Sequence, residues 1–416
     1  MRLLFICPGF SESNIIAQPW RHSYEIARNS ILKQNEIAFI TDIPFTCSLK
    51  ETTIRGLHTY ILPKQKHPPF MFPIMNPSDV KSVIKDFVPD AIYWDGSPIS
   101  GNYIRRLKNI NVPIVLHVST NIYRFEELYC AINGFYWSSS YFLFLMMSSP
   151  LLNHYIRMLN QKTINIITVP NSIIKDRLVQ RGINGDKIKV LPVFNPFNPG
   201  ESISEHSIQD MNMRIRAHNP HEELELEFED FLVTYFGPPP TYRGTDTLIH
   251  ALDKLRSKLP ELKLLMLLRQ RSKNEDVFER RLKHLSKKLG LDKRVKFLSG
   301  ILDRQDLNKL LQTSDAIALP FKFIFHEPVL SILEAMSMGK PVITTRISGS
   351  SDLLNNGRGL LVDPGNSNQL ADAIYHIAKN PDHASSLSRT AKEYFLTLPK
   401  WGDLSDYVIN LINSIL

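Results

Sequence analysis

The sequence has few cysteines and no long apolar run, and these absences exclude several protein classes. Among its 416 residues only Cys7, Cys47 and Cys130 are cysteines, an odd number at distant positions. They show neither the pairing of a disulfide framework nor the spacing of a metal site. No stretch reaches the roughly 20 consecutive apolar residues that cross a bilayer. We therefore expect a globular protein of a reducing compartment, the cytoplasm.

The chain has only a moderate excess of positive charge. Lys and Arg number 49 against 41 Asp and Glu, which leaves a formal charge of +8. The basic residues are spread along the chain, so we predict no nucleic-acid module. A moderate positive charge favours phosphorylated small molecules and anionic membrane surfaces as partners.

The most apolar segment, residues 135–152, is too short and too often interrupted by serine to span a membrane. Two interpretations of it stay open. It is either a buried helix or an interfacial element that touches a membrane surface. The second interpretation predicts peripheral association with the inner face of the membrane.

Apolar runs alternate with helical patterns in both halves of the chain. In the first half the runs are residues 2–7, 36–42, 90–96 and 112–120, and most of them end in polar residues or glycine. Continuous apolar runs of this length are typical of parallel strands that helices cover on both faces. A second alternation begins near residue 229. The sequence therefore predicts two doubly wound α/β domains.

The domain boundaries follow from a change in composition. Residues 196–228 are rich in Pro, Gly, Ser, Asn and acidic residues and lose the apolar periodicity, so we predict a linker there. The N-terminal domain then covers residues 1–195 and the C-terminal domain residues 229–399. The last segment, residues 400–416, has a helical pattern. It either returns to complete the first domain or packs wholly on the second.

The stretch from residue 315 to 365 carries the most chemical information. A buried strand leads into a loop, and Pro328 suits the first turn of the helix that follows. The free amides at the start of that helix, at Leu330 and Ser331, favour phosphate together with the helix dipole. Glu334 lies one turn further on, where it can accept hydrogen bonds from the paired hydroxyls of a ribose. These features predict a nucleotide site.

Residues 334–345, EAMSMGKPVITT, resemble the second half of the signature of family 4 glycosyltransferases. The resemblance implies a GT-B fold, with two Rossmann-like domains facing across a cleft, and retaining transfer from a nucleotide-sugar donor. It assigns the donor ribose to Glu334. In the family an acidic residue precedes this Glu by seven intervening residues. Here that count gives His326, and Glu327 is one residue too close, so either His326 or Glu327 would face the donor sugar.

The family also has two basic residues that neutralise the donor diphosphate. Arg243, before a glycine, matches the second of them, whereas Pro238 occupies the position of the first. Because one positioned charge beside a leaving group is often worth about 3 kcal/mol, another cation should replace it. Arg269 and Arg271, after an apolar run, are the candidates. No acidic or histidine-rich metal motif lies near the signature, so we expect metal-independent transfer without a cofactor.

Two more positions follow from the same resemblance. Backbone groups near Ser299 and Gly300 would meet the nucleobase. His117 closes a predicted strand where many family members carry a histidine near the reacting sugar, although a single histidine at a strand end is often structural. Residues 1–165 resemble the family by architecture alone, and the usual pair of glycines after the first strand is missing.

The sequence thus predicts a retaining hexosyltransferase of cell-surface glycan or glycolipid synthesis. Its partners would be a nucleotide sugar and a glycan or lipid-linked acceptor. Two alternatives remain open: a nucleotide-sugar epimerase on the same scaffold, and a GT-B protein that binds nucleotide without transfer, for which Pro238 argues. A NAD-dependent dehydrogenase is disfavoured because no G-x-G-x-x-G follows the first strand.

Overall fold

The computed structural model describes most of the chain. The described residues are 1–12, 15, 19–42, 48–63, 75–96, 110–121, 155–197, 230–269, 276–300, 304–324, 327 and 329–416. The predictions made for the apolar segment 135–152, for His326 and for Arg271 fall outside these residues.

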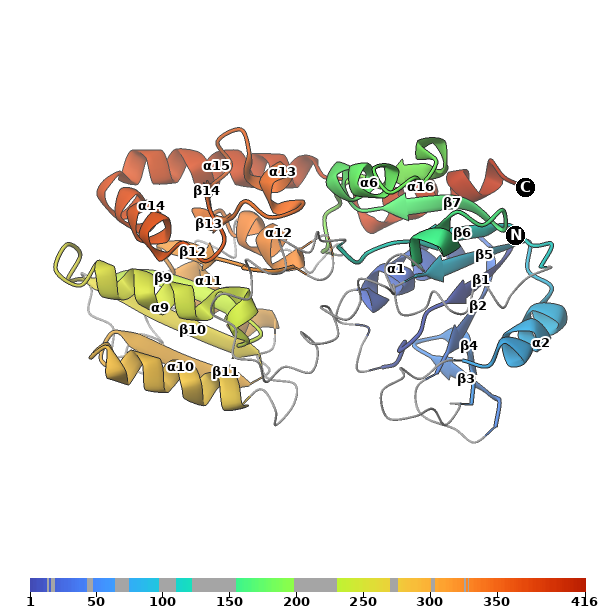
Figure 1. The fold of residues 1–416 in the computed structure, drawn as a ribbon, viewed down its shortest axis with the longest axis horizontal. Coiled ribbons are helices and arrows are strands. Elements are labelled where there is room, and N and C mark those ends of the chain that lie inside the picture. Colours follow the sequence, from blue (N-terminus) through green and yellow to red (C-terminus); the bar gives the residue numbers. More distant parts are fainter. Residues whose placement is uncertain are drawn as a thin grey trace.

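The first half of the chain forms an eight-stranded sheet in the order β3-β4-β2-β1-β5-β6-β7-β8 (Figure 1). Its strands are β1 (Arg2–Ile6), β2 (Glu36–Thr41), β3 (Lys50–Ile54), β4 (Leu57–Ile61), β5 (Ala91–Asp95), β6 (Ile114–His117), β7 (Ile164–Val169) and β8 (Ile188–Val190). The strands pair in parallel except for the antiparallel pair of β3 and β4. Strands β5 and β6 are buried along their whole length, which explains their continuous apolar sequence. The helical segments of this half whose two ends both lie in the described residues are α1 (Trp20–Ile31), α2 (Pro77–Phe87), α6 (Ser172–Val179) and η1 (Gly185–Lys187).

The second half forms a six-stranded parallel sheet in the order β11-β10-β9-β12-β13-β14. Its strands are β9 (Phe231–Gly237), β10 (Leu262–Arg269), β11 (Val295–Gly300), β12 (Ala316–Leu319), β13 (Val342–Thr345) and β14 (Leu360–Val362). Its helical segments are η2 (Thr241–Arg243), α9 (Thr245–Lys254), α10 (Asp276–Lys288), α11 (Arg304–Thr313), α12 (Leu330–Ser337), α13 (Ser350–Leu354), α14 (Ser367–Lys379) and α15 (Pro381–Thr397). The prediction of two doubly wound α/β domains is confirmed.

The order of the strands indicates where a ligand would be expected to bind at each sheet. In the second sheet β9 lies between β10 and β12, so the strand order reverses there. In the first sheet β1 lies between β2 and β5 in the same way. Loops at the carboxyl ends of strands diverge at such a switch point and leave a crevice for a ligand. The loops after β9 and β12 are therefore the first place to look for a site.

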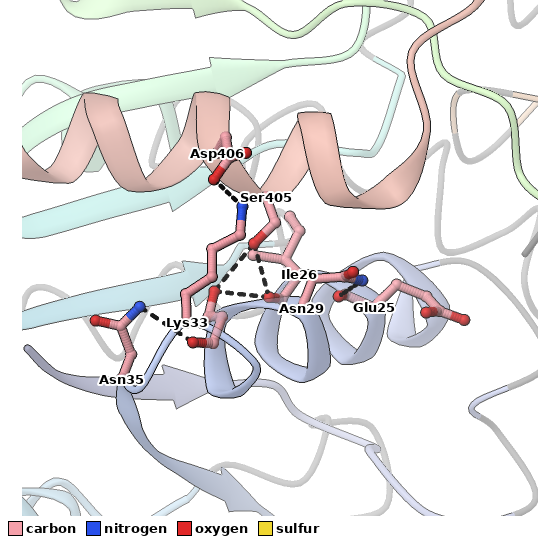
Figure 2. Close-up of polar contacts among 8 residues, drawn as sticks. Glu25, Ile26, Asn29, Lys33, Asn35, Ser405 and Asp406 are labelled. Carbon is pink, nitrogen blue, oxygen red and sulfur yellow. Dashed lines mark hydrogen bonds and ion pairs between the residues drawn. The ribbon is translucent and has the colours of Figure 1, made fainter.

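The C-terminal helix α16 (Trp401–Asn413) packs against α1 of the first half (Figure 2). Ser405 Oγ lies 3.1 Å from Ser30 Oγ and donates to the carbonyl of Ile26 at 3.1 Å. Figure 2 also shows Lys33, in the turn just after α1, reaching Asp406, with which it forms an ion pair. Helix α16 thus packs on the N-terminal half, although the two helices that precede it, α14 and α15, pack on the C-terminal half.

The two connections between the halves meet at one point. The Asn195 N–H donates to the Pro399 carbonyl at 2.8 Å. The carbonyl of Pro196 accepts from Arg21 Nη2 at 2.7 Å and from Trp401 Nε1 at 3.1 Å. The outgoing and returning segments are thereby tied to each other and to α1. Residues 1–195 and 229–399 remain the proposed domain bounds; β8 ends at Val190 and β9 begins at Phe231.

Within the described part of the chain, no helix combines the length and apolar character required to cross a membrane.

Candidate functional site

The loop after β9 rests directly on the loop after β12. The N–H groups of Lys322 and Phe323 both donate to the Tyr242 carbonyl, at 2.9 and 3.1 Å. Gly244 makes this approach possible, because it has φ +77° and a Cβ at this position would lie 1.7 Å from the Pro320 carbonyl oxygen. Only glycine fits there. The contact places the residue before it, Arg243, at the carboxyl edge of the sheet.

Arg243 is a cation that has one N–H donor without a hydrogen-bond partner among the described residues. Its guanidinium carbon lies 5.2 Å from the ring centroid of Phe321 and 5.7 Å from that of Tyr242, so the two rings hold it in place. Its Nε is buried and has no hydrogen-bond partner among the described residues. The neighbouring Lys322 is different, because its Nζ pairs with Asp246 at 2.7 Å. Of these two cations, Arg243 is the one placed to bind an added anion.

The register of the sheet brings the other donor-site candidates of this half together. In the parallel pair of β10 and β11, Arg269 lies opposite Gly300 and Leu268 opposite Ser299. All of these positions are at the carboxyl end of the sheet, and the Arg269 and Ser299 side chains are exposed. A Cβ on Gly300 would meet no heavy atom within 4 Å, so its backbone borders open space. The structure thus places a basic side chain beside the predicted nucleobase site.

The start of α12 provides uncapped amides. Its N-cap, Val329, has an extended conformation, and no side chain caps the helix. The amides of Leu330 and Ser331 are among those that a helix start leaves without an intrahelical partner. Glu334 lies half-buried in the same helix, and Leu330 packs against the hydrophobic cores of both halves. The predicted anion site therefore lies at the boundary between the domains.

Glu327 joins the two halves through its backbone and its side chain. Its N–H donates to the Ser119 carbonyl, which lies just after β6, at 2.9 Å. Its Oε1 accepts from Asn121 Nδ2 and from the Gly349 N–H, each at 3.2 Å. Ser348 Oγ donates to Asn121 Oδ1 at 2.5 Å and completes the cluster. The structure describes Glu327 but not His326, so the choice between them for the donor sugar stays a prediction.

The environment of Glu327 changes its acidity. Burial raises the pKa of this carboxyl from 4.5 to about 7, while hydrogen bonds from Asn121, Ser348 and the Gly349 amide limit the rise. A carboxyl with a pKa near 7 is present in both protonation states at neutral pH. It can therefore accept a hydrogen bond from a sugar hydroxyl or donate one to it.

Glu327→Gln is expected to change how stability depends on pH. Because the pKa of Glu327 is 4.5 in its ordinary state and about 7 when folded, the folded chain keeps a proton that the unfolded chain has released. The contribution of Glu327 to stability therefore falls as pH rises from about 5 to 8. The variant should lose less stability than the wild type over this range, by on the order of 2 kcal/mol. Urea unfolding at pH 5 and pH 8 measures this.

Some pH dependence should remain in that variant, because burial also raises the pKa of Asp95 to about 7. Equal slopes for the variant and the wild type would contradict the assigned burial of Glu327.

His117 lies at the carboxyl end of β6 within a buried polar cluster. Its Nδ1 is 3.1 Å from Thr168 Oγ1, and its ring stacks on that of His22 at a centroid distance of 4.1 Å. His22 Nε2 lies 3.0 Å from the Tyr93 hydroxyl, and burial lowers the pKa of His22 to about 3. With 1% of its surface exposed, His117 lies beneath the surface. Its role near the reacting sugar stays a prediction beside the structural one.

Four residues of the domain boundary escaped the sequence argument: Asn121, Asn171, Ser348 and Gly349. Each follows the carboxyl end of a strand, which was the only available signal. Within the described residues, no three His, Cys, Asp or Glu side chains gather as metal ligands do.

Comparisons with known proteins match part of the chain by sequence. The family model described as "Glycosyl transferases group 1" matches residues 219–394. A D-inositol 3-phosphate glycosyltransferase of Corynebacterium urealyticum is 22% identical over 240 residues, which are 57% of this chain and 54% of that protein. The enzyme of the same name from Corynebacterium efficiens is 26% identical over 174 residues, 41% of this chain and 40% of the relative. The matches thus span about half of these relatives or less.

Solved structures resemble the whole chain in fold. A glycosyltransferase from Rickettsia africae has a TM-score of 0.71 at 15% identity, with 100% of this chain and 98% of that one covered. The Anabaena protein HepE, solved with UDP and glucose, has a TM-score of 0.71 at 17% identity and full coverage of both chains. WaaG, a glycosyltransferase involved in lipopolysaccharide biosynthesis, has a TM-score of 0.66 at 15% identity, with 99% of each chain covered. The predicted GT-B fold is confirmed.

Proposed function

Since residues 219–394 match the family model of the glycosyl transferases of group 1, we propose that the chain transfers a sugar from a nucleotide-sugar donor to an acceptor hydroxyl. The observation that carries this proposal is Arg243. It is a positioned cation whose buried Nε has no partner among the described residues, at the carboxyl edge of the sheet where the strand order reverses. A donor diphosphate is an anion of suitable size, and its charge grows as the bond to the sugar breaks.

The remaining site residues receive roles around this anchor. Arg243 and the amides of Leu330 and Ser331 would bind the diphosphate, with Arg269 as the second cation in place of the residue missing at Pro238. Electrostatic stabilisation of the leaving diphosphate is then the main contribution of this half to catalysis.

The nucleoside and the transferred sugar occupy the two sides of that diphosphate. Glu334 would accept hydrogen bonds from the ribose, and Ser299 and Gly300 would border the base. Glu327 or His326 would face the transferred sugar, and His117 would lie on the acceptor side. This arrangement uses both domains, in agreement with the contacts of Glu327 to Ser119 and Asn121.

The finer features of the proposal come from the family resemblance. They are retention of configuration, a hexose as the transferred sugar, transfer without a metal, and a place in cell-surface glycan or glycolipid synthesis. The acceptor would be a glycan or a lipid-linked molecule at the cytoplasmic face of the membrane. The net charge of +8 supports peripheral attraction to an anionic surface.

A binding screen followed by product analysis tests the proposed function. UDP-, GDP- and ADP-sugars are compared by thermal shift, since a ligand at 100 times its Kd stabilises the folded state by about 2.7 kcal/mol. The bound donor is then incubated with acceptors, D-inositol 3-phosphate included because the relatives' name contains it. Transfer supports the proposal. Conversion of the donor without any acceptor supports an epimerase, and binding without turnover supports a scaffold. No binding by any donor rejects all three.

Glu334→Gln is expected to weaken nucleotide binding about tenfold, because it replaces a charged acceptor by a neutral amide of the same shape. Titration of the free nucleotide measures this without interference from the sugar. Glu261→Gln is the control, since Glu261 is a carboxylate of the same domain that pairs with Lys379 at the surface. An unchanged affinity in Glu334→Gln would remove this residue from the ribose site.

A further inference from the structure

Asn121 belongs to the N-terminal domain, but its side chain bonds to the C-terminal domain. Its Nδ2 donates to the Ile324 carbonyl at 3.1 Å and to Glu327 Oε1 at 3.2 Å, and its Oδ1 accepts from Ser348 Oγ at 2.5 Å. These bonds use both hydrogens and the oxygen of the amide, so its orientation is fixed. With 7% of its surface exposed, Asn121 is buried at the domain boundary. We call Asn121 and these three partners the interdomain cluster.

The interdomain cluster joins the N-terminal domain to two separate loops of the C-terminal sheet. Ile324 and Glu327 lie in the loop after β12, which leads to the start of α12, and Ser348 lies in the loop after β13. The N–H of Glu327 adds a backbone bond to the Ser119 carbonyl at 2.9 Å. Both loops follow the carboxyl ends of parallel strands. The N-terminal domain is therefore attached at the sheet edge that carries the proposed donor site.

The backbone of Ser348 supports a specific role for the interdomain cluster. Ser348 has φ +47°, in the left-handed region that a residue with a Cβ adopts only at a cost in free energy. Such conformations persist where surrounding contacts hold them, and the bond from Ser348 Oγ to Asn121 is one such contact. The loop after β13 is therefore held in its conformation partly by a residue of the other domain.

The next residue, Gly349, lets the two domains approach closely. A Cβ built on Gly349 would lie 2.8 Å from Asn171 Nδ2 of the N-terminal domain. Moving Asn171 aside would disturb helix α6, because Asn171 Oδ1 caps it by accepting from the Ile174 N–H at 2.9 Å. The backbone of Gly349 has φ −65° and ψ −10°, which any residue adopts. The absence of a side chain at Gly349 therefore serves the contact between the domains.

We propose that Asn121 is a positioning residue that holds the two domains in the arrangement needed for sugar transfer. Domains of one chain move relative to each other unless their interface opposes the motion. In the proposed function the donor is bound mainly by the C-terminal half and the acceptor by the N-terminal half. Their arrangement therefore sets the distance between the reacting atoms. The proposal deepens the proposed function, and its activity measurements rest on that function.

Asn121→Ala is expected to lower kcat/KM for transfer about tenfold, because it removes the amide that crosses the domain boundary. Affinity for UDP, GDP or ADP, whichever binds the wild type, should stay close to the wild-type value, since the proposed base and ribose contacts lie within the C-terminal domain. Asn165→Ala is the control. Asn165 Oδ1 accepts from the Ile114 N–H at 3.0 Å inside the N-terminal domain, so this variant should keep wild-type kcat/KM.

Gly349→Ala tests the same contact without removing any side chain of the interdomain cluster. The added methyl group would push the domains apart and should lower kcat/KM about as much as Asn121→Ala. The double variant should be little worse than either single variant, because both changes act on one contact. Small-angle X-ray scattering of the full-length chain measures the arrangement directly. The radius of gyration should rise in Asn121→Ala and Gly349→Ala and stay unchanged in Asn165→Ala.

Wild-type kcat/KM in Asn121→Ala overturns the proposal, and so does an unchanged radius of gyration in both variants. A loss of nucleotide affinity as large as the loss of kcat/KM also overturns it, because Asn121 would then act on the donor site itself. Absence of turnover in the wild type rejects the proposed function instead, while scattering still tests the role of Asn121. If Asn121→Ala melts below the assay temperature, Gly349→Ala decides by both measurements.

Discussion

Arg243→Ala is expected to lower kcat by roughly two to three orders of magnitude, the usual effect of removing one positioned charge-stabilising donor. The guanidinium is held over Phe321 and Tyr242 and keeps a buried Nε without a described partner, so it is set in place before the donor binds. Its expected partner is the donor diphosphate, which gains charge in the transition state. A free nucleoside lacks this group, so its affinity should change little. Steady-state kinetics and nucleoside titration measure the two effects separately.

Arg243→Lys should restore part of the activity, because it keeps the charge but not the planar donor set. Arg358→Ala is the matched control. Arg358 is another cation over an aromatic ring of the same domain, with its guanidinium carbon 3.9 Å from the ring centroid of Tyr394. It is half-buried, donates to the carbonyls of Asn355 and Asp352, and should be dispensable for turnover. If Arg243→Ala keeps wild-type turnover, the diphosphate role passes to Arg269.

Trp401→Ala is expected to destabilise the N-terminal domain by roughly 3 to 5 kcal/mol, the usual cost of removing a buried aromatic ring. The Trp401 side chain is buried, and its ring centroid lies 4.2 Å from that of Phe194. Its Nε1 donates to the Pro196 carbonyl, which ties the returning chain to the outgoing one. The variant would lose both the packing and this link. Urea unfolding followed by circular dichroism measures the loss.

Two comparisons separate the contributions of Trp401. Trp401→Phe keeps an aromatic ring in the same place but loses the hydrogen bond and part of the ring, so it should cost more than the roughly 1 kcal/mol of one hydrogen bond and less than Trp401→Ala. Tyr407→Ala changes an exposed aromatic residue of the same helix, with 37% of its surface accessible, and should cost less than Trp401→Ala. If Trp401→Ala were no more harmful than Tyr407→Ala, α16 would not be an integral part of the N-terminal core.

The fold class was predictable because central strands such as β6 and β12 are buried on both faces. A strand such as β12 is apolar at every position, and this pattern does not depend on which strand lies beside it. The order of the strands in each sheet could therefore not be predicted from this pattern. Whether α16 would return to α1 or stay with α15 also remained open, since an apolar helical face fits either surface. The choice depends on contacts such as Ser405 with Ser30, between residues far apart in the chain.

Some residues of the candidate site could also be found from the local sequence, and others only from the structure. Arg243, Glu334 and the start of α12 could be proposed from the sequence, because one short segment, with its local turn and helix start, carries each of them. Asn121 could not, because its partners Glu327 and Ser348 reach it from another domain. A side chain that completes a site across a domain boundary leaves no local pattern.

The sequence by itself predicted the α/β class, the resemblance of the C-terminal half to a glycosyltransferase family and a candidate nucleotide site, because local periodicity and a contiguous motif indicate them. Only the tertiary structure decided that Glu327 contacts Ser119 and Asn121 of the N-terminal domain, and that Asn171 Nδ2 is buried without a partner among the described residues. The physical reason is that burial and hydrogen-bond satisfaction depend on atoms brought together from distant parts of the chain.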